Sequence, residues 1–185
     1  MTLRPFDRIL LLILLVLSGL ITQREAVQLG LGTIAQTTPS PTAQPERKGF
    51  VLVTRAVDGD TLELSTGERV SMVGIDTPES VHPTKGVQCF GKEASAYTNS
   101  LVANQWVRME RDITDKDRYG RLLRIIYMED GSMLNDTLVR QGYAMVYTYP
   151  PDVTFVPQLR EAQTEARLAG RGLWSACQPT PSQIK

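Results

Sequence analysis

Apolar and polar residues alternate through residues 50–57 and 61–64, and a third strand-like run follows at 69–75. Asp-Gly-Asp at 58–60 separates the first two runs, and Thr-Gly at 66–67 separates the second from the third. Alternation with a period of two places every second side chain on one face of a strand, and such Gly-containing pairs are typical of turns. This part of the chain is therefore predicted to form a meander of three strands.

The rest of the chain alternates between helical and strand patterns. Apolar residues at helical spacing predict helices over residues 91–105, 133–141 and 156–169. Short apolar runs at 106–111 and 122–127 predict two more strands. Five strands and three helices in roughly 130 residues indicate the α+β class, most simply a small closed barrel with the helices packed outside it.

The two ends of the chain differ from its middle. Arg4 and Arg8 precede an apolar run at 9–21, which is shorter than the about 20 residues that a membrane-spanning helix needs. A cleaved secretory signal peptide is the favoured interpretation and a retained membrane anchor the alternative, so the protein is predicted to be secreted or part of the cell envelope. The predicted divisions are residues 1–35 (signal peptide or anchor), 36–48 (Pro/Thr-rich linker), 49–177 (folded domain) and 178–185 (disordered tail).

The charges of the chain balance. Lysine and arginine together number 20, as do aspartate and glutamate, and without residues 1–45 the two counts are 17 and 18. No overall positive field therefore attracts nucleic acid, and any phosphate binding must be local, because charge acts over only about 10 Å at ordinary salt. The single histidine, His82, disfavours nucleases that depend on a histidine base or a histidine metal site.

Two cysteines, Cys89 and Cys177, lie in the part of the chain that export would carry out of the cytosol. In an oxidising compartment an even number of cysteines favours a disulfide, whereas in the cytosol two isolated cysteines are more often free buried thiols. The disulfide is favoured here, and it would join the last helix to the loop after the acidic stretch. No third sulfur or second histidine supports a zinc site.

Four acids are the main candidates for chemistry. Asp58 and Asp60 flank a glycine in a turn, and Asp76 and Glu79 flank Thr-Pro after a strand-like run. None of them follows a helical charge pattern that would explain it as part of a solvated face. Gathered carboxylates indicate a hard cation, while the structural alternatives are a hairpin turn for the first pair and a helix start for the second.

Six short motifs resemble the staphylococcal nuclease (thermonuclease) family from about residue 50 to residue 174. They are Val-Asp-Gly-Asp-Thr, Gly-Ile-Asp-Thr-Pro-Glu, Gly-Lys-Glu-Ala-Ser, Asp-Arg-Tyr-Gly-Arg, Asn-Asp-Thr-Leu-Val-Arg-Gln-Gly and Gly-Leu-Trp, in this order. Each fragment alone is weak evidence for the family, whereas six fragments in the same order and spacing are specific for it. The resemblance implies a five-stranded OB-fold barrel with three helices and a calcium-dependent phosphodiesterase that acts on DNA and RNA and leaves 3′-phosphate ends.

The resemblance also implies a role for each acid. Asp60 and Asp76 would bind Ca²⁺ directly together with the backbone carbonyl of Thr77. Asp58 would support these ligands without contacting the ion. Oxygen ligands with several waters suit calcium, and an exported enzyme meets enough of the ion to fill a weak site. Glu79 would orient or deprotonate the attacking water.

Arginine and tyrosine residues would bind the substrate. Arg121 matches the arginine that holds the phosphate and stabilises the transition state, for which a guanidinium with two parallel donors is suited. The remaining positions that would contact nucleic acid are Lys85, Arg118, Tyr119, Tyr147 and Tyr149. For each tyrosine, packing at the edge of the barrel is the structural alternative to stacking on a base.

One position departs from the family. An arginine normally lies five residues before the second metal-binding aspartate, and here Ser71 occupies that position. Arg69 lies two residues earlier on the same strand face, roughly 6 to 7 Å away along the strand, and is the candidate substitute. The expected enzyme is a monomer without an obligate protein partner, touching a membrane only if its N-terminus is retained. The rivals are a catalytically impaired OB-fold module that binds nucleic acid or protein and an envelope-anchored binding protein.

Overall fold

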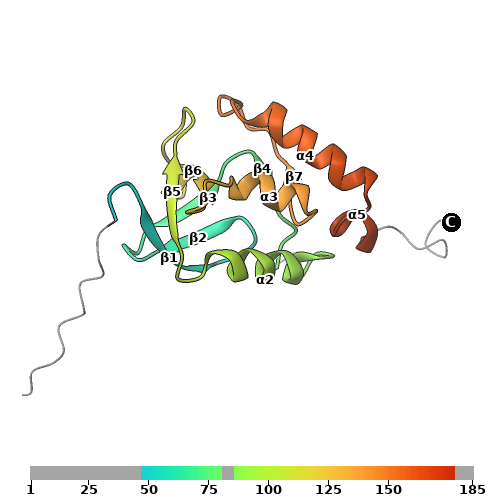
Figure 1. Cartoon of the computed structure of the whole chain (residues 1–185), viewed down its shortest axis with the longest axis horizontal. Helices are drawn as coiled ribbons and strands as arrows, with labels where there is room; N and C mark the ends of the chain where they lie inside the picture. Colours follow the sequence, from blue (N-terminus) through green and yellow to red (C-terminus); the bar gives the residue numbers. More distant parts are fainter. Residues whose placement is uncertain (1–46, 81–85, 178–185) are drawn as a thin grey trace, which may run out of the picture. The chain divides into compact units, whose positions relative to one another are not determined.

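The protein is described here by a computed structural model that covers residues 47–80 and 86–177, all within one compact unit (Figure 1). The predictions for residues 1–46, for Lys85 and for residues 178–185 lie outside these ranges. None of the helices in the two described ranges has the length and apolar character needed to cross a membrane.

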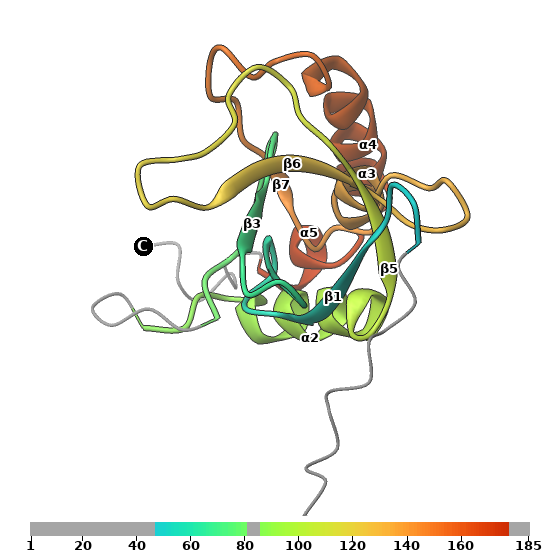
Figure 2. The ribbon, with the colours of Figure 1, turned by 90° about the vertical axis from the view of Figure 1, so that its left-hand side faces the viewer.

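Five strands form a closed barrel in the order β1-β2-β3-β6-β5. Neighbouring strands are antiparallel except β3 and β6, which run parallel. Figure 2 shows the barrel strands with α2 below β1. Each predicted strand has a counterpart, which confirms the α+β class and the closed barrel. The strands are β1 (Val51–Ala56), β2 (Thr61–Leu64), β3 (Arg69–Met72), β5 (Trp106–Glu110) and β6 (Leu122–Tyr127).

The third predicted strand was wrong in its length. Residues 69–75 are not continuous, because β3 ends at Met72 and a separate strand, β4 (Ile75–Asp76), pairs with β7 (Met145–Val146). Gly74 lies between them with φ of 81°, a left-handed conformation that only glycine adopts without strain. A side chain at Gly74 would also approach the Leu159 side chain to 2.7 Å. The chain therefore bends out of the barrel just before the second acidic pair.

Of the four helices within the described residues, three were predicted, with ends within a few residues. The fourth is a short C-terminal helix that the sequence patterns did not indicate. Contacts between elements place α2 against β1, and α3 between β6 and α4. The helices are α2 (Gly91–Val102), α3 (Leu134–Arg140), α4 (Val156–Leu168) and α5 (Leu173–Ala176).

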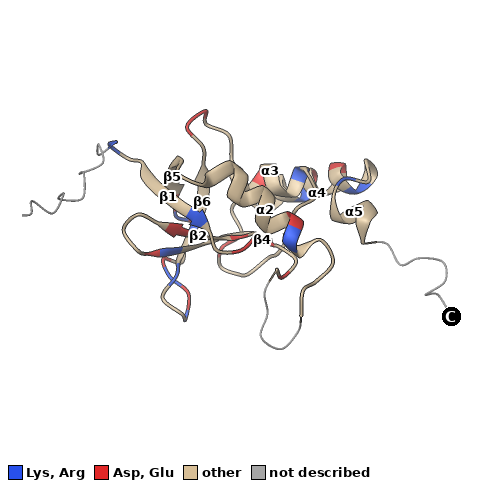
Figure 3. Cartoon of the chain, turned by 90° about the horizontal axis from the view of Figure 1, so that it is seen from below, with Lys and Arg blue, Asp and Glu red and all other residues tan. Residues whose placement is uncertain are grey.

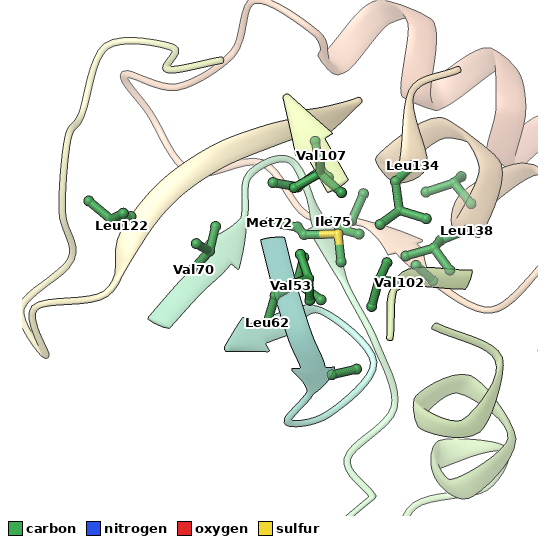
Figure 4. Packing of buried hydrophobic residues seen from close by; sticks show 14 of the residues in the cluster. Val53, Leu62, Val70, Met72, Ile75, Val102, Val107, Leu122, Leu134 and Leu138 are labelled. Atoms are coloured by element: carbon green, nitrogen blue, oxygen red, sulfur yellow. The ribbon is translucent and has the colours of Figure 1, made fainter. Parts of the chain in front are cut away.

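The core continues from the barrel interior into the layer under the helices (Figure 4). Leu62 and Val70 fill the barrel, and Leu138 on α3 packs beyond it, all fully buried. Asn135 is also fully buried, and its amide joins two elements: Oδ1 accepts from the Ile126 N–H (3.0 Å) and Nδ2 donates to the Val73 carbonyl (2.8 Å). A buried amide with both ends satisfied fixes the bend between β3 and β4.

A disulfide joins Cys89 and Cys177, as predicted, with the two Cα atoms 5.8 Å apart. It connects the segment before α2 to the residue after α5 and encloses a separation of 88 residues. A cross-link over a loop of this length stabilises mainly by restricting the unfolded chain.

We expect the double substitution Cys89→Ser and Cys177→Ser to lower the free energy of unfolding by about 3 kcal/mol, because the unfolded chain regains its freedom. Denaturant titration followed by tryptophan fluorescence measures the change. Adding reductant should reproduce the loss in the wild type and leave the double variant unchanged. Equal stability of oxidised and reduced wild type would contradict this account.

Candidate active site

A pocket of about 600 Å³ opens where four chain segments meet beside the barrel: the β1–β2 turn, the end of β3 through β4 and residues 77–79, the β5–β6 loop, and the segment after β7. Every predicted site residue that the structure describes lines this pocket except Arg69. These residues are Asp58, Asp60, Ser71, Asp76, Thr77, Glu79, Arg118, Tyr119, Arg121, Tyr147 and Tyr149.

The Asp58-Gly59-Asp60 turn lies against the segment that follows β4. Asp60 Oδ2 accepts the Thr77 backbone N–H (3.2 Å), and Asp58 Oδ1 accepts the N–H of Asp60 (3.1 Å). A side chain on Gly59 would come within 2.5 Å of Thr77 Oγ1, so glycine is needed for this approach. The turn is thus both a hairpin connection and the element that brings the two acidic pairs together.

Asp60 is surrounded by negative charge. Burial raises its pKa, the neighbouring carboxylates of Asp58 and Asp76 raise it further, and the result is a pKa of about 7 despite the opposing hydrogen bond from Thr77. Such a cluster of carboxylates is more favourable when a positive charge shares it. The donor set therefore fits a cation.

The oxygen donors at this end of the pocket fit Ca²⁺ chemically. Asp60 and Asp76 offer carboxylate oxygens, and Thr77, which follows Asp76, can offer its backbone carbonyl. Among the described residues, no thiol or imidazole lines the pocket. Within residues 47–80 and 86–177, no three acidic, histidine or cysteine side chains are arranged closely enough to hold a metal ion by themselves. The calcium site predicted from the sequence needs only two carboxylates, one backbone carbonyl and water as ligands.

Glu79 is held by its backbone and not by a helix. Its N–H donates to Gln88 Oε1 (2.9 Å), and its carbonyl accepts the Gln88 N–H (2.9 Å). A side chain at Gly91 would meet the Glu79 carbonyl oxygen at 2.3 Å, so the first residue of α2 packs directly against this segment. Residues 77–80 are not helical, which excludes the helix-start alternative.

Arg121 is fixed by two partners. Its Nε donates to Asp117 Oδ2 (2.7 Å) and its Nη1 donates to Thr61 Oγ1 (3.2 Å). Burial raises the pKa of Asp117, but the hydrogen bonds and charge of Arg121 and the N–H of Tyr119 outweigh it, so the pKa lies below its usual range. No described residue accepts a hydrogen bond from Nη2 of Arg121, and that group remains to bind an anion.

The three predicted nucleotide-contacting tyrosines are exposed. Tyr119, Tyr147 and Tyr149 have relative exposures of 70%, 54% and 65%. Arg118 donates to the Tyr119 hydroxyl (2.7 Å) and its guanidinium lies 4.8 Å from the ring centre. Rings exposed to this degree around a pocket favour stacking on a ligand over edge packing.

Ser71 lies inside the pocket and Arg69 outside it. On β3, Ser71 is opposite Thr61 of β2 and Leu123 of β6. Arg69 is opposite Glu63 and lines a separate hollow beside the pocket. Its proposed substitution for the missing arginine therefore stays a prediction.

Two hydrogen-bonded contacts tie the loops at the pocket rim to each other. The buried Asp152 accepts the N–H groups of Ile113 (2.9 Å) and Thr114 (2.7 Å) through Oδ1. In the opposite direction, Asp112 accepts the N–H (3.0 Å) and the hydroxyl (2.7 Å) of Thr154. The β5–β6 loop and the segment after β7 are thereby held together.

We expect Asp152→Asn to lower the free energy of unfolding by about 1–2 kcal/mol at pH 7, because the charge that strengthens both hydrogen bonds is lost. Burial raises the pKa of Asp152, but the hydrogen bonds from Thr114 and Ile113 lower it below its usual range. The carboxylate therefore stabilises the fold fully above its unfolded pKa of about 3.9, and this contribution is lost as the pH falls through the lower folded pKa.

Denaturant titrations between about pH 2 and 7 measure this effect, and the gap between wild type and Asp152→Asn should narrow on acidification. Glu161→Gln, at an exposed position on α4, is the control and should differ little from the wild type. A gap that does not depend on pH would contradict a charge-based role for Asp152.

Several residues that shape the site escaped the sequence patterns. Gln88 and Thr61 carry no signal that separates them from other polar residues. Asp117 does carry a signal, because an aspartate three residues before a glycine is typical of a type I turn. Its carboxylate accepts the backbone N–H groups of Tyr119 and Arg121. Asp152 follows two prolines. In the sequence these prolines indicated the end of an apolar run, and they gave no sign that Asp152 would bind the backbone of the β5–β6 loop.

Comparison with known proteins places the chain among nucleases. Residues 69–176 match the family described as Staphylococcal nuclease homologue. The proteins named thermonuclease from Staphylococcus intermedius and Staphylococcus hyicus are 40% and 37% identical over 126 residues, which are 66% of this chain and 74% of each relative. Endonuclease YncB of Bacillus subtilis is 35% identical over 130 residues, 68% of this chain and 61% of that protein. The family match includes Glu79 and Arg121 and begins after Asp58 and Asp60.

Proposed function

Since the chain belongs to the family of staphylococcal nuclease homologues, we propose that it is an endonuclease that hydrolyses phosphodiester bonds of DNA and RNA in a calcium-dependent reaction. The observation that carries this proposal is the single pocket that gathers Asp60, Asp76, Glu79 and Arg121. An acidic end and a guanidinium in one pocket match a phosphodiester group, which needs a base on one side and positive charge on the other.

Glu79 is the proposed general base, and it lines the pocket. Its backbone is fixed on both sides by Gln88, so its side chain starts from a defined position at the pocket wall. As a general base the carboxylate accepts a proton from the water that attacks phosphorus. The bond from phosphorus to the 5′ oxygen breaks, which leaves a 3′-phosphate, and the leaving 5′ oxygen takes up a proton from solvent. Glu79 returns its proton to solvent.

Arg121 acts on the phosphate. Asp117 and Thr61 hold two of its nitrogen atoms, so the guanidinium binds a phosphate oxygen without first losing its own freedom. A fixed donor also stabilises the additional negative charge of the five-coordinate transition state. Arg118, at the same rim, is the second cation for a neighbouring phosphate.

Ca²⁺ is the proposed cofactor, held by the carboxylates of Asp60 and Asp76 and the carbonyl of Thr77, with Asp58 supporting Asp60. When bound, the ion supplies positive charge that polarises the phosphate and activates water. The negative charge gathered around Asp60 supports this assignment.

The substrate is proposed to be single-stranded or relaxed nucleic acid, cut with little sequence preference. Tyr119, Tyr147 and Tyr149 offer exposed rings, and every base has a face that stacks on such a ring. No obligate protein partner is proposed, and the enzyme is taken to act as a monomer. The disulfide supports export to an oxidising compartment, with the N-terminal residues as a signal peptide or anchor.

A second candidate function is a catalytically impaired module that binds nucleic acid or protein. Ser71 favours it, because serine lines the pocket where the family has a phosphate-binding arginine. Loss of such a fixed charge lowers a rate by about 10² to 10³.

Digestion of plasmid DNA, single-stranded DNA and RNA by the purified protein tests these alternatives. We expect cleavage with Ca²⁺ and loss of cleavage after chelation. No calcium-dependent cleavage would overturn the enzyme proposal. If the wild type is inactive and Ser71→Arg cleaves, the serine is the cause of the impairment, and the module remains the function of the natural chain.

A further inference from the structure

A second hollow adjoins the active-site pocket on the side of the β2–β3 turn. It shares Lys116, Tyr119 and Arg121 with the pocket, so the two are continuous along the β5–β6 loop. The other residues that line it are Gly67, Glu68, Arg69 and Gly120. Side chains at Gly67 and Gly120 would meet no atom within 4 Å, so open space lies above both turns.

Of the three cations that line this hollow, Arg121 is paired with Asp117 at 2.7 Å, and the other two are Arg69 and Lys116. Neither Arg69 nor Lys116 forms an ion pair with a described residue, and both are exposed. Glu63, opposite Arg69 on β2, pairs with Arg55 at 2.6 Å.

The one acid that lines the hollow, Glu68, accepts a hydrogen bond from the Thr66 hydroxyl (3.2 Å). In the described part of the chain, basic and acidic segments both occur on several elements (Figure 3). An excess of free positive charge beside the pocket is therefore a local feature that the balanced net charge does not reveal.

Tyr119 lies at the boundary between pocket and hollow. The residue is 70% exposed, and the guanidinium groups of Arg118 and Arg121 lie 4.8 Å and 5.8 Å from the centre of its ring. An exposed ring flanked by cations offers stacking for a base and contacts for the phosphates on either side.

We infer that the hollow binds a phosphate of the same nucleic-acid strand, next to the bond that is cut. The inference rests on the proposed nuclease function. Arg69 and Lys116 contact this phosphate, Tyr119 stacks on the intervening base, and Arg121 stays on the scissile phosphate in the pocket. The subsite recognises backbone charge and not sequence, and it makes cleavage depend on substrate length.

Cleavage of single-stranded oligonucleotides of two to ten nucleotides tests the subsite. In the double variant Arg69→Ala and Lys116→Ala, the advantage in kcat/KM of a ten-nucleotide over a two-nucleotide substrate should fall about tenfold, roughly threefold per contact. Lys92→Ala with Arg160→Ala, at exposed positions outside pocket and hollow, is the matched control and should keep the advantage. For a labelled ten-nucleotide strand, the slope of log K of binding against log salt should become smaller in magnitude by about 0.7, the value for one phosphate of a single strand.

An unchanged length advantage and an unchanged salt slope in the double variant would overturn the subsite. An equal loss on substrates of every length would also overturn it, because Arg69 would then act on the scissile phosphate. A wild type that cleaves nothing refutes the nuclease proposal separately, and in that case the salt slope of binding still decides whether the hollow holds a phosphate.

Discussion

Replacing Glu79 by glutamine is expected to lower kcat by about 10³-fold or more, because the amide keeps the size of the side chain and cannot accept the proton from water. The backbone hydrogen bonds with Gln88 use main-chain atoms of Glu79 and are retained in the variant. Stability and affinity for a single-stranded oligonucleotide should therefore stay near those of the wild type. Single-turnover cleavage at saturating Ca²⁺ measures the chemical step directly.

Glu93→Gln is the matched control for this substitution. Glu93 is exposed in the first turn of α2 and does not line the pocket, so its loss should leave kcat unchanged. A loss of less than tenfold in Glu79→Gln would contradict the role of general base. A large loss accompanied by weaker folding would instead indicate that the carboxylate holds the segment after β4.

The fold was predictable where one physical pattern dominated. Alternation located the first three barrel strands and short apolar runs located the other two, and side chains from all five strands contribute to the core in Figure 4. The division of 69–75 into two strands was not visible in the sequence. The apolar run continues through Val73 and Ile75. The reasons for the break are the left-handed backbone of Gly74 and the Leu159 side chain, far along the chain, which leaves no room for a side chain at Gly74.

The candidate site was predictable as a set of residues and not as a structure. Its acids and Arg121 lie in short motifs, and the pocket brings them together as expected. The groups that hold them act over long separations: Arg121 reaches Thr61 across 60 residues, and Asp152 reaches Ile113 across 39. Polar residues that serve as hydrogen-bond partners have no periodicity or composition of their own, so sequence patterns cannot separate them from solvent-exposed residues.

These supporting contacts differ from the acids in what they do. Gln88, Asp117 and Asp152 bind backbone groups or a guanidinium and so hold the segments that carry the acids and Arg121. These hydrogen bonds fix the shape of the pocket. The charges of Asp58 and Asp76 still make ionised Asp60 less favourable, which is seen in its raised pKa. Sites that are rigid in geometry and unbalanced in charge are poised to bind an ion of opposite sign.

Replacing Arg121 by alanine is expected to lower kcat/KM by about 10² to 10³, because the fixed donor to the phosphate is lost. Arg121→Lys should lose nearly as much, since an ammonium group cannot bind Asp117, Thr61 and a phosphate in one planar arrangement. Arg124→Lys is the control: Arg124 pairs with Asp115 at 2.6 Å and does not line the pocket. Steady-state cleavage of a single-stranded oligonucleotide measures all three. If Arg121→Lys stays within threefold of wild type, charge alone suffices and the guanidinium geometry has no catalytic role.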